Sequence, residues 1–419
     1  MKYIHRHIEQ LVQQTSQNFK CLLLAGARQT GKSTLLKSVF GGIRYVEIDD
    51  VFIEEQAREN PAMFLSVNHP PVIFDEIQRV PGLFRNIKQV CDGEEDSGMF
   101  IMSGSQPLEL MAKASESLSG RVGILELSGL SLREMTGIPF THPFVPTMEY
   151  LSERAKHPVF SGNIWEIIHR GSYPELQKKS MDWNIFYSSY VKTYLERDVR
   201  QISAVQNLDD FRRFMISVAA RTGQVVNYTA IANEVGRDLG TIRNWLSILE
   251  SSGIIYQLEA YAPTALRRAI HSPKIYFRDT GLAAYLLRWL TPETLANGAM
   301  SGALFETFVI GEILKSFSNK GIDYRYCVSY YRGRDKKKRK INGETVELEC
   351  EIDLIIEENG ILYPIEIKQS PKVTADETSA FTVLDSVSEK KRGTGAIVCA
   401  CPMPGMLRDN ILQIPVTYL

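Results

Sequence analysis

Short apolar runs alternate with polar, helix-forming stretches through the first third of the chain. The predicted strands are Cys21–Ala25, Arg44–Ile48, Val72–Phe74, Met99–Met102 and Val122–Leu127. Each run ends at a turn or a polar cluster, and helical patterns lie between the runs. This alternation predicts a parallel sheet covered by helices, and therefore an α/β domain.

The pattern changes twice after this domain. Residues 136–158 are rich in proline and irregular, which predicts a connector or lid. Helical spacing follows from Asp182 to about Leu290, and from Ser301 one helical stretch precedes a strand-rich end. We expect an α/β domain over 1–135, a connector over 136–185, a helical domain over 186–300 and a smaller α/β domain over 301–419.

Composition limits the partners and the compartment. With 48 basic and 49 acidic residues the formal net charge is −1, so any attraction to nucleic acid must come from local patches. The six cysteines form no Cys-x-x-Cys pair, which argues against a zinc site and suits a reducing compartment. No run of about 18 apolar residues and no signal-peptide pattern is present. We expect a cytoplasmic protein without a membrane span.

A phosphate-binding loop is predicted between the first strand and the helix that follows it. The stretch GARQTGKS follows CLLLA and precedes TLLKSVF, which is the context that such a loop requires. Lys32 would reach the β- and γ-phosphates of ATP, and the Ser33 hydroxyl would bind Mg²⁺. The expected nucleotide-binding residues are Gly26, Ala27, Arg28, Gln29, Thr30, Gly31, Lys32, Ser33 and Thr34.

Two adjacent carboxylates predict hydrolysis in addition to binding. In PVIFDEIQ an apolar strand ends at Asp75, which would hold Mg²⁺ directly or through water. Glu76 then lies where a carboxylate can orient and polarise the attacking water. The pair predicts an ATPase.

Two further positions are candidates for contact with the γ-phosphate. Ser105, or alternatively Ser103, ends the apolar stretch FIMSGSQP and would sense this phosphate, as in ATPases of the additional-strand class. Arg121 precedes the last strand and would act as an arginine finger, or is a surface arginine.

The helical region contains the pattern of a winged helix-turn-helix. Helices are predicted near Thr229–Val235 and Leu239–Ser251, and a strand over Ile254–Tyr261 would form the wing. The side chains that can face outward toward DNA are Arg237, Thr241, Arg243 and Asn244. A module that only packs against the ATPase is the alternative.

The C-terminal region combines carboxylates with a lysine. Asp353 lies on one predicted strand, an Asn-Gly turn follows, and Glu366 and Lys368 share a face of the next strand. Glu306, on the preceding helix, would add a third carboxylate. Such a group can hold a divalent metal and polarise a phosphodiester, although a plain ion pair between Glu366 and Lys368 is the alternative.

A basic segment lies between two predicted strands of this region. Residues 332–340, RGRDKKKRK, contain seven basic residues and one acidic residue, which gives a local charge of +6. An exposed hairpin tip of this charge could follow a DNA backbone, or could be a solvated loop.

The chain resembles a group of bacterial and archaeal AAA-type ATPases that carry a C-terminal domain of unknown function. The matching stretches are GARQTGKST, PVIFDEIQRVPGL, FIMSGSQP, SLREM, YLERDV, DTGLAAYLL, LFETFVIGEIL and EIDLIIEENGILYPIEIK. The C-terminal pattern Asp353…Glu366-x-Lys368, with Glu306, resembles PD-(D/E)xK nucleases. The resemblance implies a phosphate-loop sheet of the additional-strand class, a helical winged-helix middle and a small restriction-endonuclease-like α/β domain.

The function implied is ATP binding and hydrolysis that is coupled to a DNA-associated C-terminal module. Two alternatives stay open, an ATP-dependent metal nuclease and a signalling or scaffold ATPase with an inactive, protein-binding nuclease-like domain. ATP and Mg²⁺ are the expected cofactors. DNA, through residues 332–340 or the winged helix, and a second copy of the chain are the candidate partners.

Overall fold

Five parallel strands form the sheet of the N-terminal part of the molecule. The computed structural model describes residues 3–105, 107–199, 207–262, 272–334, 339–341, 344–346, 349–387 and 390–419. The strands are β1 (Cys21–Ala25), β2 (Arg44–Glu47), β3 (Val72–Asp75), β4 (Phe100–Gly104) and β5 (Val122–Glu126), in the order β2-β3-β4-β1-β5. All five predicted strands are confirmed, and β4 lies between β1 and β3 as the inserted strand of the additional-strand class.

Apolar side chains on both faces hold this sheet. On β1, Leu22 and Leu24 pack with the residues of α1 (Glu9–Asn18) and α2 (Lys32–Val39). Cys21 and Leu23 face the opposite cluster, which includes residues of α4 (Pro61–Val67), α5 (Leu83–Gly93) and α6 (Pro107–Ser117). The two faces explain why β1 is apolar at every position, since neither face meets water.

The middle of the chain is helical around a small antiparallel sheet. Its main helices are α10 (Trp183–Thr193), α12 (Leu208–Ala219), α13 (Tyr228–Val235), α14 (Leu239–Ser251) and α16 (Thr280–Leu286). The sheet has the order β6-β8-β7, with β6 (Gln224–Val225), β7 (Ile255–Leu258) and β8 (Lys274–Phe277). Both predicted helices of the turn motif are confirmed, and the predicted following strand is shorter than expected.

The C-terminal part is a seven-stranded mixed sheet with one long helix, α18 (Ser301–Ser318). Its path is β16-β17-β15-β13-β12-β9, and β14 pairs with β13. The strands are β9 (Val328–Arg334), β12 (Glu349–Glu358), β13 (Ile361–Lys368), β14 (Lys391–Arg392), β15 (Gly395–Cys399), β16 (Gly405–Arg408) and β17 (Ile411–Pro415). The predicted Asn359-Gly360 turn is confirmed: both residues have positive φ, and β12 and β13 pair across it.

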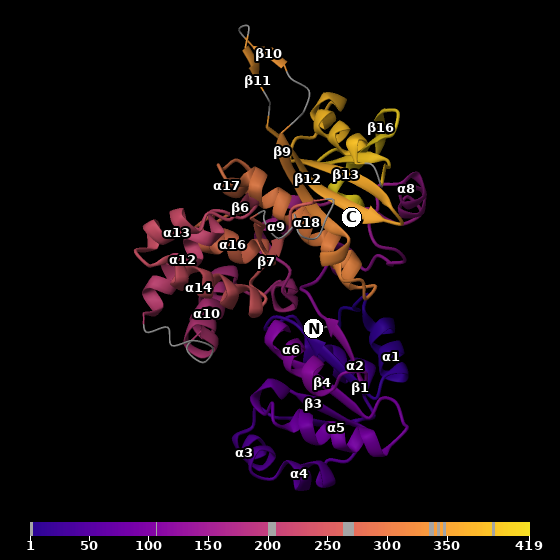
Figure 1. Cartoon of the computed structure of the whole chain (residues 1–419), viewed down its shortest axis with the longest axis vertical. Coiled ribbons are helices and arrows are strands. Elements are labelled where there is room, and N and C mark those ends of the chain that lie inside the picture. The colour runs from indigo at the N-terminus through magenta and orange to yellow at the C-terminus, as the bar shows by residue number, and fades with distance from the viewer. Residues whose placement is uncertain are drawn as a thin grey trace.

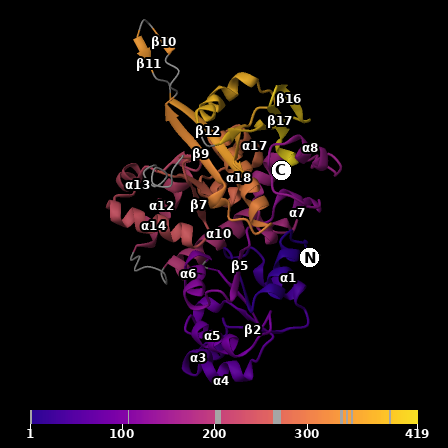
Figure 2. The same cartoon turned by 45° about the vertical axis from the view of Figure 1, so that its right-hand side comes forward.

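Shorter elements complete the chain. A separate ribbon of β10 (Arg339–Ile341) and β11 (Glu344–Val346) stands away from the main body (Figures 1 and 2). The remaining helices are α3 (Val51–Glu59), α7 (Leu132–Thr136), α8 (Met148–Arg154), α9 (Ile164–Arg170), α17 (Pro292–Ala296), η1 (Ile77–Arg79), η2 (Pro174–Gln177), η3 (Tyr194–Val199), η4 (Tyr324–Tyr326), η5 (Ala375–Ser386) and η6 (Val416–Tyr418). Within the described part of the chain no helix combines the length and apolar character needed to cross a bilayer.

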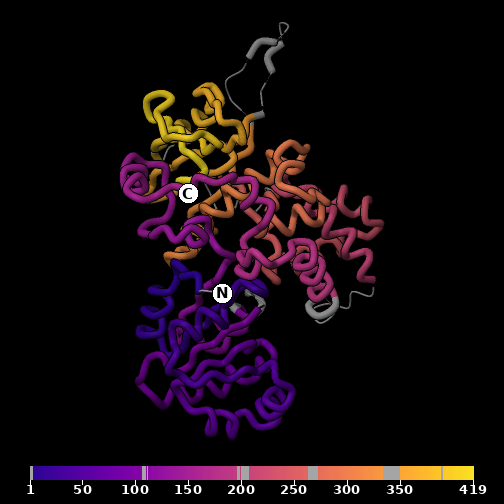
Figure 3. The backbone as a smooth tube through the Cα atoms, turned by 180° about the vertical axis from the view of Figure 1, so that it is seen from behind, coloured from indigo at the N-terminus to yellow at the C-terminus, as the bar shows by residue number. Residues whose placement is uncertain are grey.

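The N-terminal sheet lies at one end of the molecule and the C-terminal sheet at the other, with the helical part beside them (Figures 1 and 3). A single buried cluster runs from Leu132 to Leu419 and includes residues of the connector, the helical part and the C-terminal sheet. The predicted boundary at 300/301 therefore crosses a continuous core. The division into domains stays a prediction.

Candidate functional site

The loop between β1 and α2 has the backbone shape of a phosphate cradle. Gln29 and Gly31 have φ of 60° and 93°, so the chain turns sharply before α2 begins at Lys32. At Gly26 a Cβ atom would lie 2.4 Å from the Leu127 carbonyl oxygen, which leaves room only for glycine. The loop is thus pressed against the end of β5.

Lys32 is held inside this loop. Its side chain is buried, and Nζ donates to the carbonyl oxygens of Gly26, at 3.0 Å, and Ala27, at 2.9 Å. A buried ammonium among backbone groups is a fixed positive charge at the start of α2, where the helix dipole adds a positive potential. The loop is electrostatically suited to bind phosphate.

Asp75, at the end of β3, accepts three hydroxyl hydrogen bonds. The donors are Ser33 Oγ, at 2.6 Å, Ser103 Oγ and Tyr45 OH. Burial acts to raise the pKa of Asp75, but these three hydrogen bonds, together with the charge of Lys32, lower the pKa overall. Asp75 is therefore an anion beside Ser33. The contact between Tyr45 and Asp75 could not be predicted from the sequence, because β2 and β3 become neighbours only in the folded sheet.

Glu76 begins a different set of contacts. It has a φ of 58°, and its Oε2 accepts from Ser105 Oγ at 3.0 Å and from Gln78 Nε2. Gln78 Nε2 also lies 3.0 Å from Ser105 Oγ. The two candidates for the polar residue that senses the γ-phosphate, at the end of β4, thus have separate contacts. Ser105 donates to Glu76, and Ser103 donates to Asp75. Sequence reasoning missed Gln78.

Arg121 lies away from these residues. Its backbone oxygen accepts from Cys21 N, at the start of β1, whereas the phosphate loop follows the end of β1. The five residues of β1 therefore separate the backbone of Arg121 from the phosphate loop by roughly 16 Å. Its guanidinium is bonded to Asp92, at 2.5 Å, and to the Ser119 carbonyl. Arg121 therefore cannot reach the phosphate loop of its own chain.

The pocket at the phosphate loop has a second wall from the helical part of the chain. The first wall includes Arg28, Gln29 and Thr34. Facing them are residues of η2, α10 and η3: Pro174, Glu175, Tyr190, Thr193 and Tyr194. The sequence placed these residues in a connector and a separate helical domain. A nucleotide in this pocket would touch both.

The predicted C-terminal residues come together around a lysine that the sequence did not single out. Lys274 Nζ, on β8, lies 3.3 Å from Glu306 Oε1 and 2.5 Å from Glu351 Oε1. Lys368 Nζ lies 2.5 Å from Glu366 Oε1. Asp353 Oδ2 accepts from the Ile367 amide at 2.8 Å, next to a register shift between β12 and β9. We call Glu306, Asp353 and Glu366 the carboxylate cluster.

Burial and mutual repulsion make this cluster retain protons. Burial first, and then the charge of Asp353, raise the pKa of Glu306 to about 7 and that of Glu366 to about 8. Burial also raises the pKa of Asp353. Among the described residues no group of three or more acidic, histidine or cysteine side chains is arranged to hold a metal ion. The cation in contact with Glu306 is the Lys274 ammonium.

Three of the four candidate DNA-contacting side chains, those of Arg237, Thr241 and Arg243, have partners within the chain. Arg237 is paired with Asp210, and the Arg243 guanidinium lies over the Tyr228 ring, 5.3 Å from its centre. Thr241 Oγ1 donates to Asp238 at 2.6 Å. Of the basic segment 332–340, residues 335–338 lie outside the described residues, as do the side chains of 334, 339 and 340.

Comparison with known families supports the reading of the first site. The family model described as "AAA domain" matches residues 18–136, which contain the loop, Asp75 and Glu76. We refer to residues 18–136, which are similar to this model, as the AAA domain. This match supports ATP binding and hydrolysis by the AAA domain. A second model, "Domain of unknown function (DUF8612)", matches residues 161–293, which are the helical part that faces the AAA domain across the pocket.

Two mycobacterial relatives match most of the chain, and both are described as uncharacterized proteins. The chain is 27% identical over 367 residues to an uncharacterized protein of Mycobacterium tuberculosis and to one of Mycobacterium bovis, which covers 87% of this chain and 74% of each relative. Among solved structures it is similar to a Walker-type ATPase of Pyrococcus abyssi (12% identity, TM-score 0.38, 68% of this chain and 96% of that one). It is also similar to AMPPCP-bound DnaA of Aquifex aeolicus (12%, TM-score 0.27, 58% and 85%). At such identities and scores neither likeness bears on function.

Proposed function

We propose that this protein is an ATP-hydrolysing switch whose nucleotide state is coupled to a DNA-binding module made by the rest of the chain. The arrangement of the carboxylates at the end of β3 is the observation that supports ATP hydrolysis. Asp75 is held as an anion beside Ser33, and Glu76 is held separately by Ser105 and Gln78. Two adjacent carboxylates with different partners suit two different roles.

Ser33 and Asp75 fit Mg²⁺. A hydroxyl and an ionised carboxylate, 2.6 Å apart, are the hard oxygen ligands that this ion prefers, with the remaining positions left to water and phosphate. A bound Mg²⁺ would neutralise charge on the β- and γ-phosphates. Lys32 would add its fixed charge to the same phosphates.

Glu76 would then accept a proton from the attacking water. Its hydrogen bonds to Ser105 and Gln78 fix the carboxylate in the unliganded protein, and its release or reorientation would accompany the reactive state. Glu76→Gln should bind ATP normally and hydrolyse it roughly 10²–10⁴-fold more slowly, because an amide cannot take the proton. Lys32→Ala should abolish binding. Wild-type turnover by Glu76→Gln would remove Glu76 from the proposed role.

We assign the macromolecular partner to DNA and the C-terminal part to a nuclease-like binding module without cleavage. The helix-turn-helix pair α13–α14 followed by β7 and β8 supports a winged helix in the middle. The Glu306, Asp353, Glu366 and Lys368 constellation supports a PD-(D/E)xK-like fold. The absence of metal-holding geometry among the described residues, together with the Lys274 ammonium on Glu306, favours binding over cleavage.

One experiment separates the proposals for the whole protein. ATP turnover is measured without DNA and with single-stranded, duplex and branched DNA, and cleavage of the same DNAs is followed with Mn²⁺. Stimulation without cleavage supports the switch. Cleavage that Asp353→Ala abolishes would establish the nuclease alternative, and turnover indifferent to every DNA would favour a protein-directed scaffold ATPase.

A further inference from the structure

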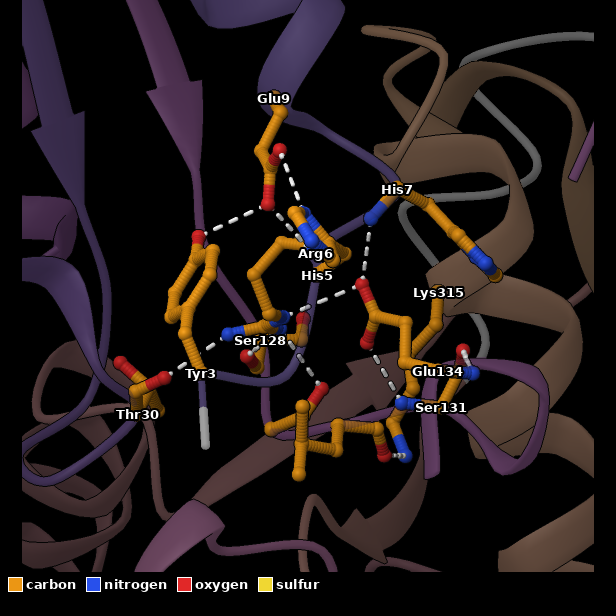
Figure 4. A network of polar contacts seen from close by, with 12 residues as sticks. Tyr3, His5, Arg6, His7, Glu9, Thr30, Ser128, Ser131, Glu134 and Lys315 are labelled. Carbon is orange, nitrogen blue, oxygen red and sulfur yellow. Dashed lines mark hydrogen bonds and ion pairs between the residues drawn. The ribbon is translucent and has the colours of Figure 1, made fainter. Parts of the chain in front are cut away.

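The chain that follows β5 lies between the phosphate loop and the rest of the molecule. We call residues 128–134 the junction segment. On one side it contacts the N-terminal segment that precedes α1, and on the other side it contacts α18 (Figure 4). The AAA domain model includes the junction segment and ends two residues after it, whereas Arg6 lies before the start of that model.

Arg6 bridges the junction segment and the phosphate loop. Its Nη1 donates to the Thr30 carbonyl at 2.9 Å, and its Nη2 donates to the carbonyls of Ser128, at 2.8 Å, and Gly129, at 3.3 Å. Its Nε donates to Glu134 Oε1 at 3.1 Å. The side chain of Arg6 is 4% exposed and that of Glu134 is 1% exposed, so this ion pair is shielded from water.

Glu134 is fixed by more than Arg6. It forms a capping box with Ser131 at the start of α7, and it accepts from the His7 amide at 2.8 Å. Burial acts to raise the pKa of Glu134, but the neighbouring Arg6 and His7 and the backbone hydrogen bonds lower it overall. The carboxylate is therefore a stable anion against which the Arg6 guanidinium is oriented.

The other side of the junction segment is held by α18. Glu312 Oε2 accepts from the Leu132 amide at 2.8 Å, and Lys315 Nζ donates to the Leu130 carbonyl at 2.9 Å. Glu312 and Lys315 also bond each other at 2.7 Å. The position of the segment that orients Arg6 is thus set by a helix of the C-terminal part.

The contact with Thr30 has a direct consequence for phosphate. In a trans peptide the carbonyl and the following N–H point in opposite directions. By holding the Thr30 carbonyl on one side, Arg6 turns the Gly31 N–H toward the other side. Backbone amides of this loop are the groups that cradle the phosphates. Rotation of this one peptide would remove a donor from the cradle.

We propose that Arg6 is a positioning residue of the nucleotide site, which aims the Gly31 amide at the phosphates and takes its own position from the junction segment. The proposal rests on the ATP-binding function proposed above. Arg6 touches neither Asp75 nor Glu76 in any contact described, so its effect falls on nucleotide affinity and not on the chemical step.

The test compares two buried arginines in the full-length protein. Arg6→Lys keeps the charge beside Glu134 but loses the planar fork that spans Thr30 and the junction segment. Arg154→Lys is the matched control, because Arg154 is also buried and bonds backbone carbonyls, those of His157, Pro158 and Thr417, away from the loop. Affinity for fluorescent ATP and ADP, kcat, KM and the unfolding temperature are measured for each.

Arg6→Lys should lower the affinity for ATP and for ADP alike by about tenfold, which corresponds to the loss of one charge-assisted hydrogen bond. The KM for ATP should rise, with kcat nearly unchanged. Arg154→Lys should leave both affinities at the wild-type value. Unaltered affinity in Arg6→Lys, or an equal loss in both variants, overturns the inference while the proposed function stands. If wild-type protein binds no ATP, the proposed function itself fails.

If Arg6→Lys does not fold, Glu134→Gln serves instead. It leaves the guanidinium and its carbonyl partners in place but removes the charge that orients them, and the isosteric amide keeps most of the capping box. A loss of ATP affinity of several-fold with kcat retained supports the same assignment. Wild-type affinity in a folded Glu134→Gln protein overturns it.

Discussion

Asp75 and Glu76 are neighbours in the chain, yet their carboxylates contact different partners. The strand β3 ends at Asp75, and the left-handed backbone of Glu76 turns the second carboxylate away from the first. Ser103 and Ser105 are two residues apart on the adjacent β4 and its end, so they follow the same division. In the proposed mechanism Asp75 is the carboxylate directed to the metal and Glu76 the one directed to water.

Two matched serine variants test this division. Ser105→Ala removes a hydrogen bond to Glu76, so kcat should fall roughly tenfold with little change in Mg²⁺ affinity. Ser103→Ala removes a hydrogen bond to Asp75, so Mg²⁺ affinity should fall with less effect on kcat at saturating Mg²⁺. Titration of ATP turnover with Mg²⁺ gives both quantities. Identical behaviour of the two variants would contradict the division.

A second residue-scale prediction concerns Gly26. Gly26→Ala would place a methyl group 2.4 Å from the Leu127 carbonyl oxygen, and because this neighbour is backbone it leaves little room for adjustment. We expect loss of ATP binding and a fall of about 1–3 kcal/mol in the free energy of unfolding. Gly42→Ala is the control, because a Cβ atom there meets no atom within 4 Å. A Gly26→Ala protein with normal affinity would mean that β5 moves aside.

The sequence predicted the strands of the AAA domain well, for a physical reason. The phosphate loop is contiguous, the strand before it is a short continuous apolar run, and the helix after it has apolar residues at helical spacing. Tyr45, Gln78 and Arg6 were missed because their roles arise from neighbours in space. Arg6 and Glu134 are 128 residues apart in the chain, and no local pattern relates them.

At the scale of elements, β8 of the helical part supplies the cation of the carboxylate cluster on α18, β12 and β13. The motif Asp353…Glu366-x-Lys368 predicted the carboxylates, but not that Lys274 would approach them. Such a contact depends on how β8 packs against α18, which periodicity does not determine. The carboxylates of the predicted metal site therefore lie beside two ammonium groups, those of Lys274 and Lys368.

Lys274→Met tests the importance of this cation. The side chain of Lys274 is 3% exposed, so removing it leaves buried carboxylates without their partner, and the free energy of unfolding should fall by roughly 3–5 kcal/mol. The double variant Lys274→Met, Glu306→Gln should regain much of this loss, because an uncharged pair needs no compensation. Urea unfolding measures both. No loss in the single variant would show that the ammonium is not needed.

At the scale of the whole molecule, the cluster makes stability depend on pH. Glu306 and Glu366 have an ordinary pKa of 4.5 and a folded pKa of about 7 and about 8. Between these values the folded state holds more protons than the unfolded state, so stability falls as the pH rises through this window. The pKa of Lys274 is raised above a value that is already alkaline, so Lys274 adds no slope here.

The carboxylate cluster should accordingly lower the unfolding temperature from pH 4.5 to about pH 8, and His7 and His169, whose pKa burial lowers from 6.5, oppose this decrease below about pH 6.5. Glu366→Gln should flatten this decrease, because one of the proton-retaining groups is gone. Asp385→Asn, an exposed carboxylate paired with Arg392, is the control and should leave the slope unchanged. An equal slope in Glu366→Gln would show that the carboxylate cluster does not dominate the titration.

The continuous core from Leu132 to Leu419 limits how this protein can be dissected experimentally. A fragment that begins at residue 301 would carry Glu306 without Lys274, and would expose Leu304 and Phe305 to water. Such a fragment would bind other proteins and plastic surfaces through its exposed apolar face. Partner screens with truncated baits would therefore return false interactors. Full-length protein carrying point substitutions is the form in which a genuine partner can be recognised.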